Sequence, residues 1–182
     1  AIGSFAAVFS TAHAADTYPS NPLRWVIATA AGGGSDAMAR MIATQLSAQL
    51  GQNVVIDNRP GGASVIASEN VIRSPADGYT LFSADNGTLI FNTVLFKKLS
   101  YDPVKDFVPV GLTARFPLVL ATYPTSGFST VQDAIEAIKK APGTYSYASS
   151  GIGSPHHLAM EMLEQRAGLD INHAPYKGGA PA

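Results

Sequence analysis

The chain has 182 residues, of which 46% are hydrophobic and only 14% are charged, and its formal net charge at pH 7 is −1. These values suit a globular protein of one domain or two small ones, and they give no general attraction to nucleic acid or anionic membranes. Because the chain contains no cysteine, disulfide bonds, thiolate metal sites and a cysteine nucleophile are excluded.

The first residues are typical of a processed leader rather than of a folded element. Residues 1–8 are small and apolar, and Ala12-His13-Ala14 is an A-x-A cleavage signal before Ala15. We therefore predict that residues 1–14 are the remnant of a signal peptide and that the protein is exported and soluble. The chain ends on turn residues without a closing element, which indicates a fragment.

The first half of the chain alternates between short apolar runs and helical patterns with short connections. The predicted elements are strands at 23–28, 53–56 and 79–83 and helices at 37–50 and 64–73. We expect Ser35 or Asp36 to be the N-cap of the first helix. This β-α-β-α-β order predicts a parallel sheet with helices on its faces, and so an α/β fold.

The second half continues the pattern after a polar, proline-containing crossing at 101–107, where we place the change of domain. Residues 85–98 give no single pattern. The predicted elements beyond the crossing are strands at 108–112, 116–123, 144–148 and 171–174, and helices at 131–140 and 154–167. We expect the strand at 116–123 to be buried, because its apolar character is nearly continuous.

Two turns carry the candidate chemistry, because each joins a predicted strand to a helix. They are Gly32-Gly33-Gly34-Ser35-Asp36 and Ser149-Ser150-Gly151-Ile152-Gly153-Ser154. The start of a helix leaves backbone N–H groups unpaired at the positive end of the helix dipole, which suits an anion. Two such turns predict a ligand held at both ends by its negative groups. Neither turn contains G-x-S-x-G, so an esterase is not indicated.

Two other functions remain open on the same residues. Gly32-x-Gly34-x-x-Ala37 matches the dinucleotide-binding fingerprint, and Asp57 follows at the distance of a ribose-binding acid, so a Rossmann-type oxidoreductase is an alternative. The glycines could also serve only tight packing in a structural module without a ligand. The adjacent pair His156 and His157 does not predict a metal site, because neighbouring side chains on a helix point about 100° apart.

Eight short segments give the chain a specific resemblance from Tyr18 to its last residues. They are Tyr18-Pro19-Ser20-Asn21-Pro22, Gly32-Gly33-Gly34-Ser35-Asp36, Asp57-Asn58-Arg59-Pro60-Gly61, Asp77-Gly78-Tyr79-Thr80-Leu81, Tyr101-Asp102-Pro103-Val104-Lys105-Asp106-Phe107, Tyr147-Ala148-Ser149-Ser150-Gly151, His157-Leu158-Ala159 and Pro175-Tyr176-Lys177-Gly178-Gly179. Together they resemble the Bug-type (tripartite tricarboxylate transporter, TctC-like) extracytoplasmic solute-binding proteins.

The resemblance implies a type II periplasmic binding fold of two lobes, here residues 15–100 and 101–182, with the second lobe incomplete. It implies a non-enzymatic periplasmic receptor without cofactor or metal, which we expect to be a monomer. It also implies that the receptor closes on a di- or tricarboxylate or a related organic acid and delivers it to membrane components of the transporter. The binding residues it carries over are Gly32, Gly33, Gly34, Ser35 and Asp36, then Ser83, Asp85, Asn86 and Thr88, then Ser149, Ser150, Gly151, Ser154 and His157.

The chain departs from this family before the glycine turn, where Ala28-Thr29-Ala30-Ala31 replaces the usual prolines and aromatic residue. We expect a less rigid loop there. We expect one carboxylate on each glycine-rich turn, a hinge near Tyr101–Phe107, and Asp36 as a helix cap or as a partner of a water molecule or of a ligand amine or hydroxyl.

Overall fold

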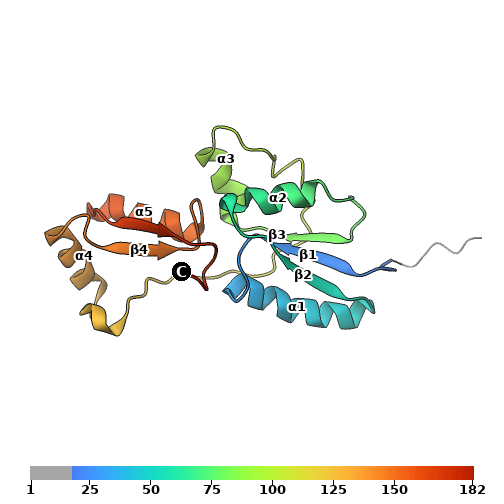
Figure 1. The fold of residues 1–182 in the computed structure, drawn as a ribbon, viewed down its shortest axis with the longest axis horizontal. Coiled ribbons are helices and arrows are strands. Elements are labelled where there is room, and N and C mark those ends of the chain that lie inside the picture. Colours follow the sequence, from blue (N-terminus) through green and yellow to red (C-terminus); the bar gives the residue numbers. More distant parts are fainter. Residues whose placement is uncertain (1–17) are drawn as a thin grey trace, which may run out of the picture.

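The computed structural model describes residues 18–182, so the predicted signal remnant at 1–14 lies outside the described residues. Two lobes lie end to end, joined by a long connection, and the C-terminus lies at the junction between them (Figure 1). None of the helices in residues 18–182 is both long and apolar enough to cross a bilayer.

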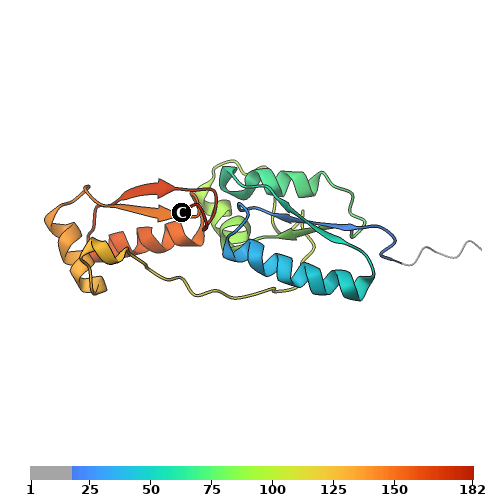
Figure 2. The same ribbon diagram turned by 60° about the horizontal axis from the view of Figure 1, so that its bottom comes forward.

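The first lobe is a three-stranded parallel sheet between two helices. Its strands, β1 (Leu23–Ile27), β2 (Val54–Asn58) and β3 (Thr80–Ser83), lie in the order β2-β1-β3. Helices α1 (Gly34–Leu50) and α2 (Val65–Ile72) cover opposite faces of this sheet (Figures 1 and 2). This arrangement confirms the predicted β-α-β-α-β unit.

Apolar burial between α1 and the sheet holds this lobe together. Trp25 and Ile27 of the central strand pack against Ala39 and Ala43 of α1, and all four are almost fully buried. The small alanine side chains let the helix lie close to the sheet, and the Trp25 indole Nε1 donates to Ser83 Oγ at 2.9 Å. Removing this apolar surface from water is the main stabilising contribution.

The N-cap prediction for α1 was wrong. The cap is Gly33, which has no side chain to bond, and the helix begins at Gly34 rather than at Ala37. Asp36 lies in the first turn of the helix, and its carboxylate Oδ2 accepts from Gly32 N at 2.9 Å. The carboxylate therefore stabilises the turn before the helix from within the helix.

The segment predicted as a hinge packs on the first lobe instead. After β3 the chain makes a π-helical turn (Gly87–Phe91) and the short helix α3 (Asn92–Leu95). The hydroxyl of Tyr101 donates to Thr88 O at 2.6 Å, and the Phe107 ring lies 5.4 Å from that of Phe82. Residues 101–107 are thus fixed to the lobe, and the crossing to the second lobe begins after Phe107.

The two strands predicted at 108–112 and 116–123 do not form. This part of the chain is an extended connection along one side of the molecule (Figure 2). A strand needs a partner for its backbone groups, and no strand of residues 18–182 pairs with this segment. The expectation of burial was also wrong, because the exposed apolar side chains include Val108, Val110, Leu112, Phe116, Leu118, Val119, Leu120 and Tyr123.

The second lobe contains a two-stranded parallel sheet and two helices. Helix α4 (Val131–Lys140) has the predicted bounds, and β4 (Ser146–Ser149) pairs with β5 (Asn172–Pro175) on either side of α5 (Pro155–Ala167) in the sequence. Its core is Ile138, Tyr147 and Ile171, each only 9% exposed. Two strands are marginal by themselves, so this lobe depends on the packing of its helices.

Candidate functional site

A cleft of about 410 Å³ lies where the two lobes meet. The strands of both sheets end at this junction (Figure 1), and the carboxyl ends of parallel strands are where α/β proteins bind ligands. The first lobe contributes Ala28, Thr29, Gly61, Gly62, Ala63, Ser64, Asp85, Gly87, Asn92 and Phe96. The second lobe contributes Ser150, Gly151, Ile152, Gly153, Ser154, Pro175, Tyr176 and Lys177.

The first glycine turn is not part of the cleft lining. Gly32, Gly33, Gly34, Ser35 and Asp36 are all absent from it, and a Cβ placed on Gly33 would lie 3.7 Å from the backbone nitrogen of Ala180. The C-terminal residues therefore lie against this turn. The backbone of Ala30, just before it, donates to Lys177 O at 2.8 Å.

The buried carboxylate of Asp36 is hydrogen-bonded at both of its oxygens by the protein itself. Arg40 Nε donates to Oδ2 at 3.0 Å, and Asn58 Nδ2 donates to Oδ1 at 3.0 Å. The Arg40 guanidinium, with Gly32 N and Asn58, lowers the pKa of Asp36 to about 2, although burial acts in the opposite direction. Both oxygens of Asp36 are thus bonded within the protein, and this 3% exposed carboxylate fixes the turn.

Among the residues predicted after β3, only Asp85 lines the cleft. Its Oδ1 accepts from the backbone N of Thr88 at 2.9 Å and from the Thr88 hydroxyl at 3.0 Å. Ser83 bonds to Trp25, Thr88 is buried, and Asn86 is exposed outside the lining. The structure thus makes Asp85 the cleft residue of this group, with Thr88 orienting its carboxylate.

The turn after β4 forms one wall of the cleft, through Ser150, Gly151 and Ser154. Ser154 is the N-cap of α5, since its side chain accepts from His157 N at 3.3 Å. Ser149 and His157 lie outside the lining, and their side chains accept hydrogen bonds from the backbone of this turn. Ser149 Oγ accepts from Gly151 N at 3.1 Å, and His157 Nδ1 accepts from Gly153 N at 3.3 Å. Two of the N–H groups expected to bind an anion are therefore already used.

A stack of three rings supports the same turn. The rings of Tyr147 and His173 lie 4.7 Å apart, and those of His173 and His157 lie 4.2 Å apart. His173 Nε2 lies 2.7 Å from Ser149 Oγ. Burial, and then the neighbouring His157, lower the pKa of His173.

No group of three or more potential metal ligands of the His, Asp and Glu type occurs in residues 18–182.

Sequence reasoning missed the turn Gly61–Ser64 and the side chain of Asn92. The turn precedes α2, and Ala63 and Ser64 adopt positive φ angles of 50° and 70° there. The sequence did indicate a turn at this edge of the sheet, because Arg59-Pro60-Gly61 follows a predicted strand of the same parallel sheet. Asn92 gave no signal, since it lies in the stretch without a clear pattern, yet it is only 1% exposed and lines the cleft.

The carboxylate of Asp57, named as a possible ribose-binding acid, forms ion pairs within the first lobe. Its Oδ2 accepts from Arg59 Nε at 2.8 Å and lies 3.4 Å from Arg24 Nη1. Asp57 is not in the cleft lining. An ion-paired aspartate outside the cleft does not fit the dinucleotide alternative.

Comparison with known proteins decides between the remaining possibilities. Residues 38–182 match the family described as "Tripartite tricarboxylate transporter family receptor". The chain belongs to this family. It is 38% identical over 169 residues to Protein BugT of Bordetella pertussis, covering 92% of this chain and 52% of that protein. The chain spans about half the length of the curated relatives it matches.

Solved structures of this receptor family have the same fold. "R. palustris Rpa4515 with adipate" matches with a TM-score of 0.87 and 36% identity, over 90% of this chain and 55% of that one. "MatC (Rpa3494) from Rhodopseudomonas palustris with bound malate" matches with a TM-score of 0.84 and 28% identity, over 90% and 56%. The predicted family and the periplasmic binding fold are therefore confirmed. The dinucleotide-binding alternative finds no support.

Proposed function

We propose that this receptor captures a small carboxylate, a di- or tricarboxylate or a related organic acid, in the cleft between its two lobes. The observation that carries the proposal is the cleft itself, which combines both lobes and the start of α5 in one site. Its volume of about 410 Å³ is in the range of small-molecule sites. The relatives with adipate and malate support a carboxylate solute.

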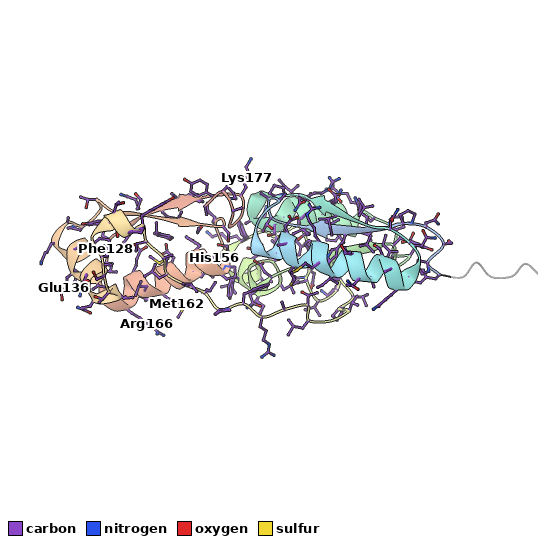
Figure 3. All side chains as sticks on the ribbon, turned by 90° about the horizontal axis from the view of Figure 1, so that it is seen from below. Phe128, Glu136, His156, Met162, Arg166 and Lys177 are labelled. Atoms are coloured by element: carbon purple, nitrogen blue, oxygen red, sulfur yellow. The ribbon has the colours of Figure 1, made fainter. Side chains whose placement is uncertain are left out.

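The second-lobe wall supplies the donors for such a solute. Ser150 and Ser154 bring hydroxyl groups to the cleft at the positive end of the α5 dipole, and Ser150 Oγ also lies 2.8 Å from His156 Nδ1. In our proposal the exposed Lys177 adds a positive charge at the edge of the cleft. Figure 3 places Lys177 at the junction of the lobes and His156 near the end of α5 that faces it. A hydrogen bond to a charged group contributes about 1.5–3 kcal/mol.

This proposal changes one part of the sequence-based mechanism. The expected carboxylate site on Gly32–Asp36 lies outside the cleft lining, so in our proposal that turn shapes the first lobe and does not hold the ligand. Ligand contacts with Ser150, Gly151, Ser154 and Asp85 remain part of the proposal. We further propose a periplasmic, non-catalytic receptor that hands its solute to the membrane components of a tripartite tricarboxylate transporter.

Calorimetry and thermal shift test the function directly. We expect binding of small di- or tricarboxylates such as succinate, malate or citrate and no binding of NAD. Ser150→Ala and Lys177→Met should each weaken carboxylate binding by about tenfold, which corresponds to one charge-assisted hydrogen bond. Ser126→Ala removes an exposed hydroxyl outside the cleft and should leave the affinity unchanged. A chain that binds none of these carboxylates, or binds NAD instead, would contradict the proposal.

A further inference from the structure

The polar groups of the cleft are divided between its walls by chemical type. The second lobe brings the hydroxyls of Ser150 and Ser154, which can donate, with Ser150 Oγ also 2.8 Å from His156 Nδ1, and exposed Lys177 lies at the edge of this wall. The first lobe brings the carboxylate of Asp85 and the carboxamide of Asn92. A carboxylate can only accept hydrogen bonds, so what the first wall can bind depends on which end of the Asn92 amide faces the cleft.

Hydrogen bonds on the inner side of Asn92 fix the orientation of its amide. Nδ2 donates to Ala63 O at 2.7 Å and to the Tyr101 hydroxyl oxygen at 3.0 Å. The Tyr101 proton is already donated to Thr88 O at 2.6 Å, so that hydroxyl can only accept from Asn92. The reversed amide would place two acceptors against each other at Ala63 and again at Tyr101.

The carboxamide oxygen of Asn92 therefore faces the second lobe, and it has no partner. Oδ1 is buried and makes no hydrogen bond among the described residues. A Cβ placed on Gly153 would lie 3.0 Å from it, which puts this oxygen against the second-lobe turn that lines the cleft. A buried acceptor without a donor is costly, so the site favours whatever brings a donor to it.

Resting on the proposed function, we infer that the first-lobe wall recognises a hydrogen-bond donor on the solute. The preferred solutes are carboxylates that also carry a hydroxyl or a protonated amine. Their carboxylate faces Ser150, Ser154 and Lys177, and their donor faces Asp85 and Asn92. A second carboxylate on the first-lobe wall would meet the like charge of Asp85 and the acceptor oxygen of Asn92. This role was one of those expected of Asp36, whose oxygens accept from Gly32, Arg40 and Asn58.

Three dicarboxylates that differ at a single carbon separate the possible donors. Succinate carries hydrogen there, malate a hydroxyl and aspartate a protonated amine. Calorimetry on the full chain should show malate or aspartate binding at least about tenfold more tightly than succinate. The malate arm reports hydroxyl recognition, and the aspartate arm reports recognition of a positive charge.

Two variants test whether the first-lobe wall is the source of this preference. Asp85→Asn keeps an oxygen for Thr88 but removes the charge, so it should reduce the advantage of aspartate over succinate by about tenfold. Asn92→Ala should reduce the advantage of malate, with far-UV circular dichroism checking the fold. Asp77→Asn is the matched control, because Asp77 also accepts from a backbone N–H, that of Tyr79, but lies outside the cleft.

Each result decides the inference. Succinate binding as tightly as malate and aspartate would overturn it and leave the proposed carboxylate function standing. Preferences that survive in both Asp85→Asn and Asn92→Ala would overturn the assignment to this wall. Failure of all three solutes, and of citrate, to bind would overturn the proposed function and this inference together.

Discussion

Gly87 of the first lobe and Gly153 of the second lie in direct contact across the junction. A Cβ placed on Gly87 would be only 2.8 Å from the carbonyl oxygen of Gly153. Real side-chain carbons do not approach a backbone oxygen so closely, so this contact requires glycine at position 87. The two lobes can therefore lie this close together only because residue 87 has no side chain.

Gly87→Ala should consequently disfavour this arrangement of the lobes. Relieving a steric conflict of this kind costs about 1–3 kcal/mol, which lowers the ratio of this arrangement to more open ones by about 5- to 150-fold. Small-angle X-ray scattering should show a larger radius of gyration, and carboxylate affinity should fall in parallel. Gly111→Ala is the control, since nothing lies within 4 Å of a Cβ placed there. An unchanged radius and affinity in Gly87→Ala would show that the lobes do not need this contact.

Asp36→Asn should destabilise the first lobe in a pH-dependent way. The pKa of Asp36 falls from 3.8 to about 2 on folding, so its ionised form stabilises the native state above the unfolded pKa. We expect a loss of about 2 kcal/mol near neutral pH, shrinking as the pH falls from about 4 to about 2. Urea unfolding followed by the fluorescence of Trp25, the only tryptophan, measures this lobe. A difference from wild type that stays constant over this range would contradict the assignment.

The second lobe should weaken in mild acid because of His173. Its pKa is lowered by burial and by His157, so below about pH 6.5 the unfolded chain takes up a proton that the folded chain resists. Stability should therefore fall as the pH drops toward about 5. His173→Gln should flatten this part of the profile in thermal unfolding, whereas exposed His156→Gln should not. Parallel pH profiles for wild type and His173→Gln would exclude His173 as the cause.

Helix α4 should depend on its N-terminal cap. Thr130 Oγ1 accepts from Asp133 N at 3.1 Å, while the Asp133 carboxylate accepts from Thr130 N at 2.9 Å. Thr130→Ala removes one half of this capping box and should cost about 1 kcal/mol in chemical unfolding. The neighbouring Ser129→Ala keeps both bonds and is the control. Equal stabilities of the two variants would mean that α4 is held by packing alone.

Local patterns were sufficient to predict most elements. Helix α4 has the predicted bounds, and β1 to β3 and α5 lie within a few residues of their predicted positions, because hydrophobic periodicity and caps act over short stretches of chain. Residues 108–123 show the limit of such patterns. Their apolar character is that of strands, but pairing depends on a partner from elsewhere, which no part of residues 18–182 supplies.

In the candidate site, too, some features could be predicted from the sequence and others could not. By itself, the sequence determined the parallel α/β layout, the family and the turn at Ser150–Ser154, since these follow from nearby residues and ordered motifs. Only the tertiary structure decided that Asp36 is bonded to Arg40 and Asn58 and that Asn92 lines the cleft with an oxygen that has no partner among residues 18–182. The physical reason is that burial and hydrogen bonds from distant segments decide how much of a polar group remains for a ligand. The partners of Asp36 and Asn92 come from segments that are brought together only by folding.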